Sequence, residues 1–187
     1  MSIKIYIDQG HNRGTINAGA QGNGVLEADV NYQVGIYLAQ LLAENSNFEV
    51  KVSRLFIDSV VGYDTKSSLQ TRVDEANDWH ADYFISIHTN ANENPSIQGS
   101  EVYVYKELSQ SYYLGEDVLE GIVMFVGTKN NQVRINPTLY VLRKTMMPSI
   151  LVELAYLTNL SDAQKLLNDQ YIFAQGMYQG ILWYFDL

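Results

Sequence analysis

Apolar and β-branched residues gather in three short runs, and each run gives way abruptly to polar residues. The runs are Ile3–Asp8, Tyr83–Ile87 and Pro148–Ala155. Unbroken apolar runs of this length are typical of strands that are covered on both faces, as in parallel sheets. Three further segments predict shorter strands because they alternate or are rich in β-branched residues: Phe48–Ser53, Glu101–Tyr105 and Thr138–Arg143.

Apolar residues at helical spacing lie between these strands. Val30, Val34 and Leu38, for example, repeat at intervals that place them on one helix face. The predicted helices run from about Asp29 to Glu44, from a cap at Ser67 or Ser68 to Trp79, from Ser111 to Val126, over two turns from Leu160, and from Tyr171 to Phe185.

Strands that alternate with helices predict an α/β fold. We expect residues 1–187 to form a single three-layer domain, with a mostly parallel or mixed β-sheet of about six strands flanked by helices. The length suits one substantial core. Neither repeats nor Pro-rich linkers interrupt the chain.

Composition excludes several classes of protein. The net charge of −9 and a pI near 4.7, without a Lys/Arg cluster, argue against nucleic-acid binding. No apolar stretch approaches the roughly 18–20 residues of a membrane span. The first residues enter a strand directly, without a signal-peptide pattern, so export would need another route or a leader outside this sequence. Without cysteine, any zinc must be held by His and carboxylate.

Candidate chemistry appears where the apolar runs end. His11 and His88, two of the three histidines, follow the first and second runs, and Glu153 lies inside the third. A strand-end histidine is more often a packing residue than a ligand. A carboxylate in an apolar strand, however, is costly to bury without a partner. Because the carboxyl ends of parallel strands meet at one edge of a sheet, the three side chains favour a metal site there.

Four other residues have less decided roles. Glu27 ends a long Gly/Asn-rich loop and is either a first-turn acid of the next helix or a ligand. Asp8 either orients a ligand or is structural. Arg72 is interpreted as an inward-facing residue that ties loops together, and His80 as an exposed helix-end residue outside the site.

With these residues in place, the chain resembles the zinc-dependent N-acetylmuramoyl-L-alanine amidases of the family 3 type. Four blocks occur in the family's order: IDQGHN, GNGVLEADVN, FISIHTNA and MPSILVELAYLTN. They correspond to the family's Asp-x-Gly-His, Gly-x-x-Glu, Ser-x-His-x-Asn-Ala and Pro-x-x-Leu-x-Glu patterns, and the similarity extends from about Ile3 to Leu182.

The resemblance implies a zinc metallohydrolase with one Zn²⁺ per chain, bound by His11, Glu27 and His88, and with Glu153 as the catalytic carboxylate. The implied substrate is peptidoglycan, cleaved between N-acetylmuramic acid and L-alanine. It also implies a bacterial autolysin or endolysin that acts outside the cell or in its wall. We expect the protein to be a monomer and to have no nucleic-acid or membrane partner.

Two alternatives stay open. A zinc peptidase acting on cell-wall peptides needs the same ligands and base, and a non-catalytic wall- or glycan-binding module needs only the ligands. Glu153 argues against the module, because it is not required to hold a metal. One residue departs from the family pattern: Asn12 follows the first histidine where the family usually has glycine, which we expect to reshape the mouth of the site.

Overall fold

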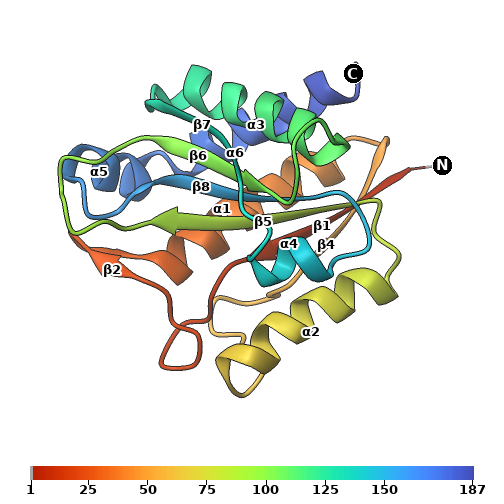
Figure 1. Ribbon diagram of the computed structural model, residues 1–187, viewed down its shortest axis with the longest axis horizontal. Helices are drawn as coiled ribbons and strands as arrows, with labels where there is room; N and C mark the ends of the chain where they lie inside the picture. Colours follow the sequence, from red (N-terminus) through yellow and green to blue (C-terminus); the bar gives the residue numbers. More distant parts are fainter. Residues whose placement is uncertain (1) are drawn as a thin grey trace.

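A computed structural model describes residues 2–187 as three layers, with a central β-sheet between two layers of helices (Figure 1). The sheet has six strands in the order β4-β1-β5-β8-β6-β7. Strand β6 is antiparallel to β8, and the other neighbours are parallel. This mixed sheet confirms the predicted fold class. The strands are β1 (Ile3–Gln9), β4 (Phe48–Val52), β5 (Tyr83–Asn90), β6 (Ser100–Val104), β7 (Asn130–Ile135) and β8 (Ser149–Tyr156).

Helices cover both faces of the sheet, which explains why the central strands carry apolar side chains on both faces. Helices α1, α3, α5 and α6 pack over one face, while α2 and α4 pack over the other around Tyr6 and Phe84. The helices are α1 (Glu27–Ala43), α2 (Thr65–Asp78), α3 (Gln110–Val126), α4 (Tyr140–Lys144), α5 (Leu160–Asn168) and α6 (Gln170–Tyr184). Within residues 2–187, no helix has both the length and the apolar character required to cross a bilayer.

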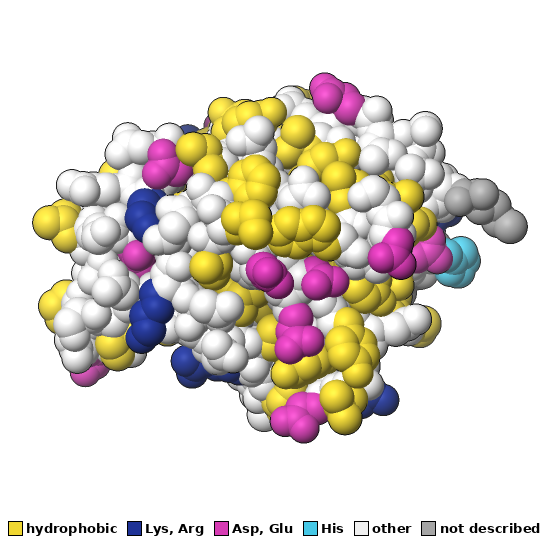
Figure 2. Space-filling model, turned by 90° about the horizontal axis from the view of Figure 1, so that it is seen from above, with side chains coloured by type: hydrophobic (Ala, Val, Ile, Leu, Met, Phe, Trp, Pro, Cys, Tyr) yellow, Lys and Arg dark blue, Asp and Glu magenta, His cyan; other side chains and the backbone are white. Residues whose placement is uncertain are grey.

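Helices α3 and α6 approach each other closely through glycines. A Cβ atom on Gly176 would lie 2.7 Å from the carbonyl oxygen of Gly121, and one on Gly180 would overlap the backbone of Asp117 and Val118. Figure 2 looks onto this side of the molecule, where hydrophobic and acidic side chains are intermingled and most visible Lys and Arg side chains lie toward the left. This face therefore offers no broad basic surface.

In the six-stranded sheet, one predicted strand was wrong and another was missed. Residues 138–143, predicted to be extended, contain the start of α4, whose Val141 and Leu142 pack beneath the sheet. The missed strand is β7, whose sequence NNQVRI lacks an apolar run because most of its side chains are exposed. Pairing of its backbone with β6, rather than burial of side chains, makes it a strand.

Smaller differences concern helix starts. Helix α1 begins at Glu27, two residues before the predicted start. Helix α2 is capped by Asp64 rather than by Ser67 or Ser68: the Asp64 carboxylate accepts from the Ser67 backbone N–H at 2.6 Å, and the Ser67 hydroxyl accepts from the Asp64 backbone N–H. This reciprocal pair satisfies two backbone donors that a helix start leaves unpaired.

Candidate metal centre

Strands β1 and β5 bring the candidate residues to one edge of the sheet. His11 lies two residues beyond β1, His88 lies within β5 near its carboxyl end, and Glu27 is the first residue of α1. A two-stranded hairpin, β2 (Gln21–Gly22) and β3 (Val25–Leu26), turns the intervening loop back, and the Glu27 backbone N–H donates to Ala20 at 3.1 Å. The loop therefore delivers Glu27 to the two histidines.

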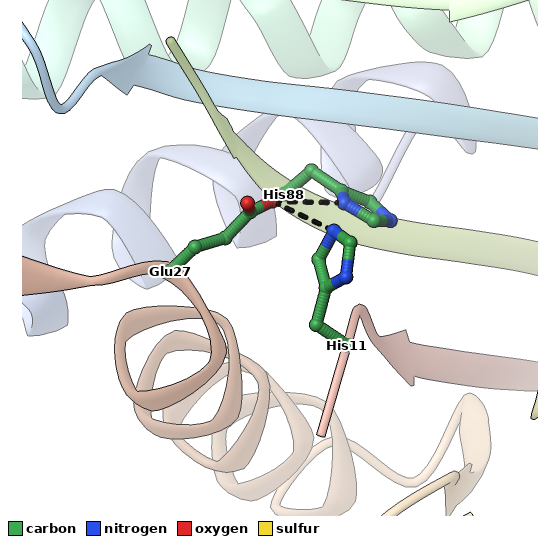
Figure 3. A group of neighbouring side chains, drawn as sticks. All are labelled: His11, Glu27 and His88. Carbon is green, nitrogen blue, oxygen red and sulfur yellow. Dashed lines mark hydrogen bonds and ion pairs between the residues drawn. The ribbon is translucent and has the colours of Figure 1, made fainter. Parts of the chain in front are cut away.

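The three side chains converge on one point (Figure 3). One carboxylate oxygen of Glu27, Oε1, lies 3.2 Å from His11 Nε2 and 3.1 Å from His88 Nδ1. The imidazole rings meet edge to face, with centroids 4.9 Å apart. One donor atom from each residue lies within 4.8 Å of the others, which is close enough to share one metal ion.

Hydrogen bonds outside the group orient these side chains. His11 Nδ1 lies 3.1 Å from the carbonyl oxygen of Asn17, so the tautomer that donates there leaves Nε2 as a lone-pair donor facing Glu27. The second oxygen of Glu27 accepts from the Ala20 backbone N–H at 2.8 Å. His11 and Glu27 are thus held in the orientation that a ligand requires.

Charge interactions within the group favour an ionised carboxylate. Burial alone would raise the pKa of Glu27, but hydrogen bonds from His11 and His88 outweigh it and hold that pKa well below its ordinary value. Burial would likewise lower the pKa of His11, and the hydrogen bond and charge of Glu27 reverse the shift, so that the pKa is raised. The buried anion therefore attracts a cation.

The donor set suits zinc. Two imidazole nitrogens and one carboxylate leave a fourth position open, which is typical of catalytic rather than structural zinc sites. The space is also reserved by glycines: a Cβ atom on Gly10 would overlap the His88 ring, and one on Gly19 would lie 2.8 Å from both Glu27 Oε2 and the His11 ring. The residues present fit the metal that the sequence resemblance implies.

The backbone of His11 is held in an unusual conformation by two buried arginines. His11 has a φ of 65°, in the left-handed region that non-glycine residues seldom adopt. Arg72 donates to its carbonyl oxygen at 2.6 Å and to that of Gln9 at 2.7 Å. Arg54 donates to the Ala28 carbonyl oxygen at 2.8 Å and, more weakly, to that of His11 at 3.4 Å. The ligand loop is therefore anchored from α2 and from the chain after β4.

Two sequence interpretations of this loop region are settled by these contacts. Arg72 ties loops together, as predicted. Asp8 does not contact the histidines: it forms an ion pair with Arg72 at 2.5 Å and accepts from the Ser86 hydroxyl at 2.7 Å, which makes its role structural.

Asn12 lies in the interior rather than at the mouth of the site. Its side-chain amide donates to the carbonyl oxygen of Val61 at 3.0 Å, and its oxygen accepts from the Val61 backbone N–H at 3.0 Å and from Arg72 at 3.0 Å. The expectation that this departure from the family pattern reshapes the mouth is wrong for the side chain itself. Asn12 instead fastens the His11 loop to the segment before α2.

Glu153 occupies β8 directly beside His88 in the parallel register. Its Oε2 atom is buried, and among residues 2–187 it has no hydrogen-bond partner. Burial, and then the charges of Glu27 and Glu101, raise the pKa of Glu153 well above its ordinary value. A carboxyl group without a salt bridge, next to a metal-type site, can take up a proton readily. None of the ion pairs among the described residues includes Glu153, so no cationic side chain there neutralises its charge.

His80 lies apart from the group. It follows α2, is exposed, and precedes β5, so it lies at the opposite end of that strand from His88. This agrees with its interpretation as a helix-end residue outside the site.

Sequence reasoning missed a buried acidic residue next to Glu153. Glu101 is fully buried and lies opposite Glu153 across the antiparallel β6–β8 pair. Its carboxylate accepts from Asn90 at 2.7 Å and from the hydroxyls of Tyr103 and Tyr156 at 3.0 Å each, and Arg134 Nε lies 2.9 Å away. A glutamate at the start of an alternating apolar strand was the available signal.

A large surface hollow elsewhere on the molecule lacks the side chains of a metal or catalytic site. This hollow, of about 630 Å³, is lined by residues after β6 and before β8, including Tyr105, Met146 and Ser149. Because β6 is antiparallel to β8, this hollow lies at the opposite edge of the sheet from Glu153. It contains no cluster of acidic or imidazole side chains.

Known proteins match this chain over almost its whole length. Residues 5–182 match the family described as N-acetylmuramoyl-L-alanine amidase. The chain is 36% identical over 185 residues to the amidase LytC of Bacillus subtilis (strain 168), covering 97% of this chain and 35% of that protein. It is 33% identical to the amidase CwlM of Bacillus licheniformis, covering 99% of this chain and 70% of the relative.

Solved structures are similar over almost the whole chain. The crystal structure of an N-acetylmuramoyl-L-alanine amidase from Clostridium difficile 630 superposes with a TM-score of 0.87 at 32% identity, covering 99% of this chain and 97% of that one. The CwlD amidase from Clostridioides difficile, solved in complex with the GerS lipoprotein, gives a TM-score of 0.90 at 26% identity, with 99% of both chains covered.

Proposed function

The chain belongs to the N-acetylmuramoyl-L-alanine amidase family, and on that premise we propose that it hydrolyses the amide bond between N-acetylmuramic acid and the L-alanine of peptidoglycan stem peptides. We further propose that one zinc ion per chain is held by His11, Glu27 and His88, and that Glu153 is the catalytic carboxylate. The observation that carries the proposal is the convergence of two imidazoles and one carboxylate beside a half-buried glutamate, whose Oε2 atom is buried and has no hydrogen-bond partner among residues 2–187.

Each ligand residue has a defined task. His11 and His88 supply neutral nitrogen donors, and Glu27 supplies the negative charge that retains a divalent cation. When bound, zinc supplies a Lewis acid that lowers the pKa of water from about 15.7 toward 7 and polarises a carbonyl group. Ala20 and Asn17 keep the donor atoms oriented through their hydrogen bonds to Glu27 and His11.

Glu153 handles the proton. In amide hydrolysis a C–O bond forms, the C–N bond breaks, and the proton lost by the attacking water must reach the departing amine. Glu153 Oε2 has no hydrogen-bond partner among residues 2–187 to lose when it accepts that proton. The protonated carboxyl group then donates to the nitrogen of L-alanine.

The setting of the activity is part of the proposal. We place residues 1–187 as one catalytic domain that acts as a monomer on peptidoglycan, outside the cell or in its wall. The names of relatives support this setting, among them a sporulation-specific amidase of Bacillus subtilis (strain 168) and an endolysin of Bacillus phage SPP1.

Digestion of purified peptidoglycan tests the function. The expected products are glycan strands with free lactyl carboxyl groups and stem peptides with a new L-alanine amino terminus, both identified by mass spectrometry. New amino termini elsewhere in the peptide would indicate a zinc peptidase instead. Binding to peptidoglycan without any cleavage, by protein loaded with zinc, would indicate a binding module.

A further inference from the structure

Arg134 lies at the far end of a row of side chains that begins at the candidate metal centre. His88, Glu153 and Glu101 occupy paired positions on neighbouring strands β5, β8 and β6, and Arg134 on β7 reaches Glu101 with its Nε atom 2.9 Å from the carboxylate. Directly paired residues of neighbouring strands project to the same face, about 5 Å apart. Glu101 therefore lies two strand spacings from His88, and the guanidinium of Arg134 contacts Glu101 from the side of β7.

The terminal nitrogens of Arg134 are available to a ligand. Its Nε donates to the Asn131 carbonyl oxygen at 3.3 Å and faces Glu101, whereas neither Nη atom has a hydrogen-bond acceptor in residues 2–187. Half of the side chain is exposed, while Glu101 is 1% exposed. The buried Glu101 carboxylate thus restrains the Nε side of the guanidinium and leaves the side with the two Nη nitrogens open to solvent.

Glu101 is well suited to be an anchor rather than a reactant. Asn90, Tyr103 and Tyr156 already donate to its Oε1 atom, so that oxygen is saturated. Its Oε2 atom faces Arg134 in an ion pair that is not aligned as a hydrogen bond. The pair consequently restricts the position of Arg134 without using its paired Nη donors, which match a carboxylate in a bidentate arrangement.

From this arrangement we propose that Arg134 binds a free carboxylate of the stem peptide and selects substrates that carry one; the inference rests on the proposed function. In a muramoyl peptide the lactyl carboxyl group is consumed by the scissile amide and the carboxyl group of L-alanine by the next peptide bond. The first free carboxylate belongs to the second residue, about 7 Å from the scissile carbonyl by chain geometry. Glu153 and Glu101 are directly paired, about 5 Å apart, and Arg134 Nε lies 2.9 Å from the Glu101 carboxylate, so the guanidinium is within a comparable reach of Glu153.

Two matched substrates test the proposal. Both are N-acetylmuramoyl dipeptides that begin with L-alanine, and their second residue has a single carboxyl group, free in one and converted to a carboxamide in the other. The zinc-loaded protein should cleave the free acid with a kcat/KM about 10- to 100-fold higher, mainly through KM, because the contact is made equally before and during reaction. Arg134→Gln should reduce this ratio to about 1.

Further variants separate binding from structure. Arg134→Gln leaves Glu101 buried without a cation, so the double variant Arg134→Gln/Glu101→Gln removes both partners and keeps the test valid if the single variant fails to fold. Arg134→Lys keeps the positive charge but lacks the two parallel Nη donors, so it should retain only part of the preference for the free-acid substrate. Arg143→Gln, at an exposed arginine of α4 beside the start of β8 and away from its carboxyl end, should keep the wild-type ratio.

The possible outcomes are distinct. Equal KM values for the two substrates with the wild-type protein overturn the carboxylate subsite and leave the amidase activity standing. A full preference that survives in the double variant also overturns it. If neither these dipeptides nor whole peptidoglycan releases an L-alanine amino terminus, the proposed function fails, and the subsite fails with it.

Discussion

Arg72 donates a hydrogen bond of 2.6 Å to the carbonyl oxygen of His11, so a residue of α2 fixes the backbone of a candidate metal ligand that lies 61 positions earlier in the chain. The same guanidinium is paired with Asp8 in the interior. The shape of the ligand loop is therefore coupled to a buried charge pair.

Replacing Arg72 by Met should strongly destabilise the protein. The variant strands the Asp8 carboxylate in the interior, and breaking a buried pair from one side costs about 3–5 kcal/mol. Urea unfolding followed by circular dichroism measures the loss. Arg143→Met, at an exposed position of α4, serves as the matched control and should stay within about 0.5 kcal/mol of wild type. A loss below about 1 kcal/mol for Arg72→Met would show that Asp8 is not dependent on this partner.

Stability should fall in acid partly through Asp8. Burial alone would raise the pKa of Asp8, but the charge and hydrogen bonds of Arg72, with the Ser86 hydroxyl, hold it below the ordinary value of 3.8. The unfolded chain then binds the proton first, so this contribution is complete above about pH 4 and is lost as the pH falls through the folded pKa. Free energies of unfolding between pH 3 and 7 should therefore drop more steeply for wild type than for Asp8→Asn. Equal slopes below pH 4 would contradict this prediction.

Metal content should depend on His88 and not on His80. His88→Ala removes one of three convergent donors, whereas His80 lies exposed beyond α2. Elemental analysis after dialysis should find about one zinc per chain in wild type and in His80→Ala, and almost none in His88→Ala. Stoichiometric zinc in the His88→Ala protein would exclude His88 as a ligand.

Glu153→Gln should lose activity while keeping its metal and its fold. The amide preserves the shape of the side chain but cannot carry the proton, and such groups typically contribute about 10²–10⁴-fold to the rate. Rate, zinc content and melting temperature are measured on the same preparation. Glu27→Gln is the contrasting variant and should lose zinc as well as activity. Full hydrolysis by Glu153→Gln would remove this residue from the mechanism.

Gly176→Ala should destabilise the contact between α3 and α6. The new methyl group would meet the Gly121 carbonyl oxygen at 2.7 Å and the Ile122 Cα at 2.9 Å, so the helices must separate. Overpacking of this kind costs about 1–3 kcal/mol, more than the roughly 0.5–1 kcal/mol gained by removing a helical glycine. Thermal unfolding compares it with Gly115→Ala, whose methyl group meets a Val102 side-chain carbon at 3.1 Å and should cost less. A more stable Gly176→Ala protein would mean that the helices adjust freely.

The apolar pattern predicted the centre of the fold better than its edge. Strands β1, β5 and β8 are buried on both faces, so their sequences record the burial. Strand β7 is exposed and is held mainly by its backbone, which leaves little trace in residue type. Short apolar segments do not distinguish a strand from a helix: Val141 and Leu142 are buried although they belong to a helix and not to the predicted strand.

The apolar pattern likewise identified some residues of the site and not others. His11, His88 and Glu153 follow or interrupt apolar runs, so the sequence singles them out, and the structure brings the first two together with Glu27. Arg134 could not be found in this way, because its partner Glu101 comes from the start of an antiparallel strand. Only the sheet order reveals that the beginning of β6 lies beside the end of β8.

The left-handed backbone at His11 has a consequence for evolution and engineering. A φ of 65° is costly for a residue with a side chain, and glycine or asparagine adopts it more readily. Selection for resistance to heat alone would therefore favour losing the histidine, while selection for hydrolysis retains it. A library of variants screened only for stability should accumulate inactive proteins with substitutions at His11. This one position therefore sets stability against activity.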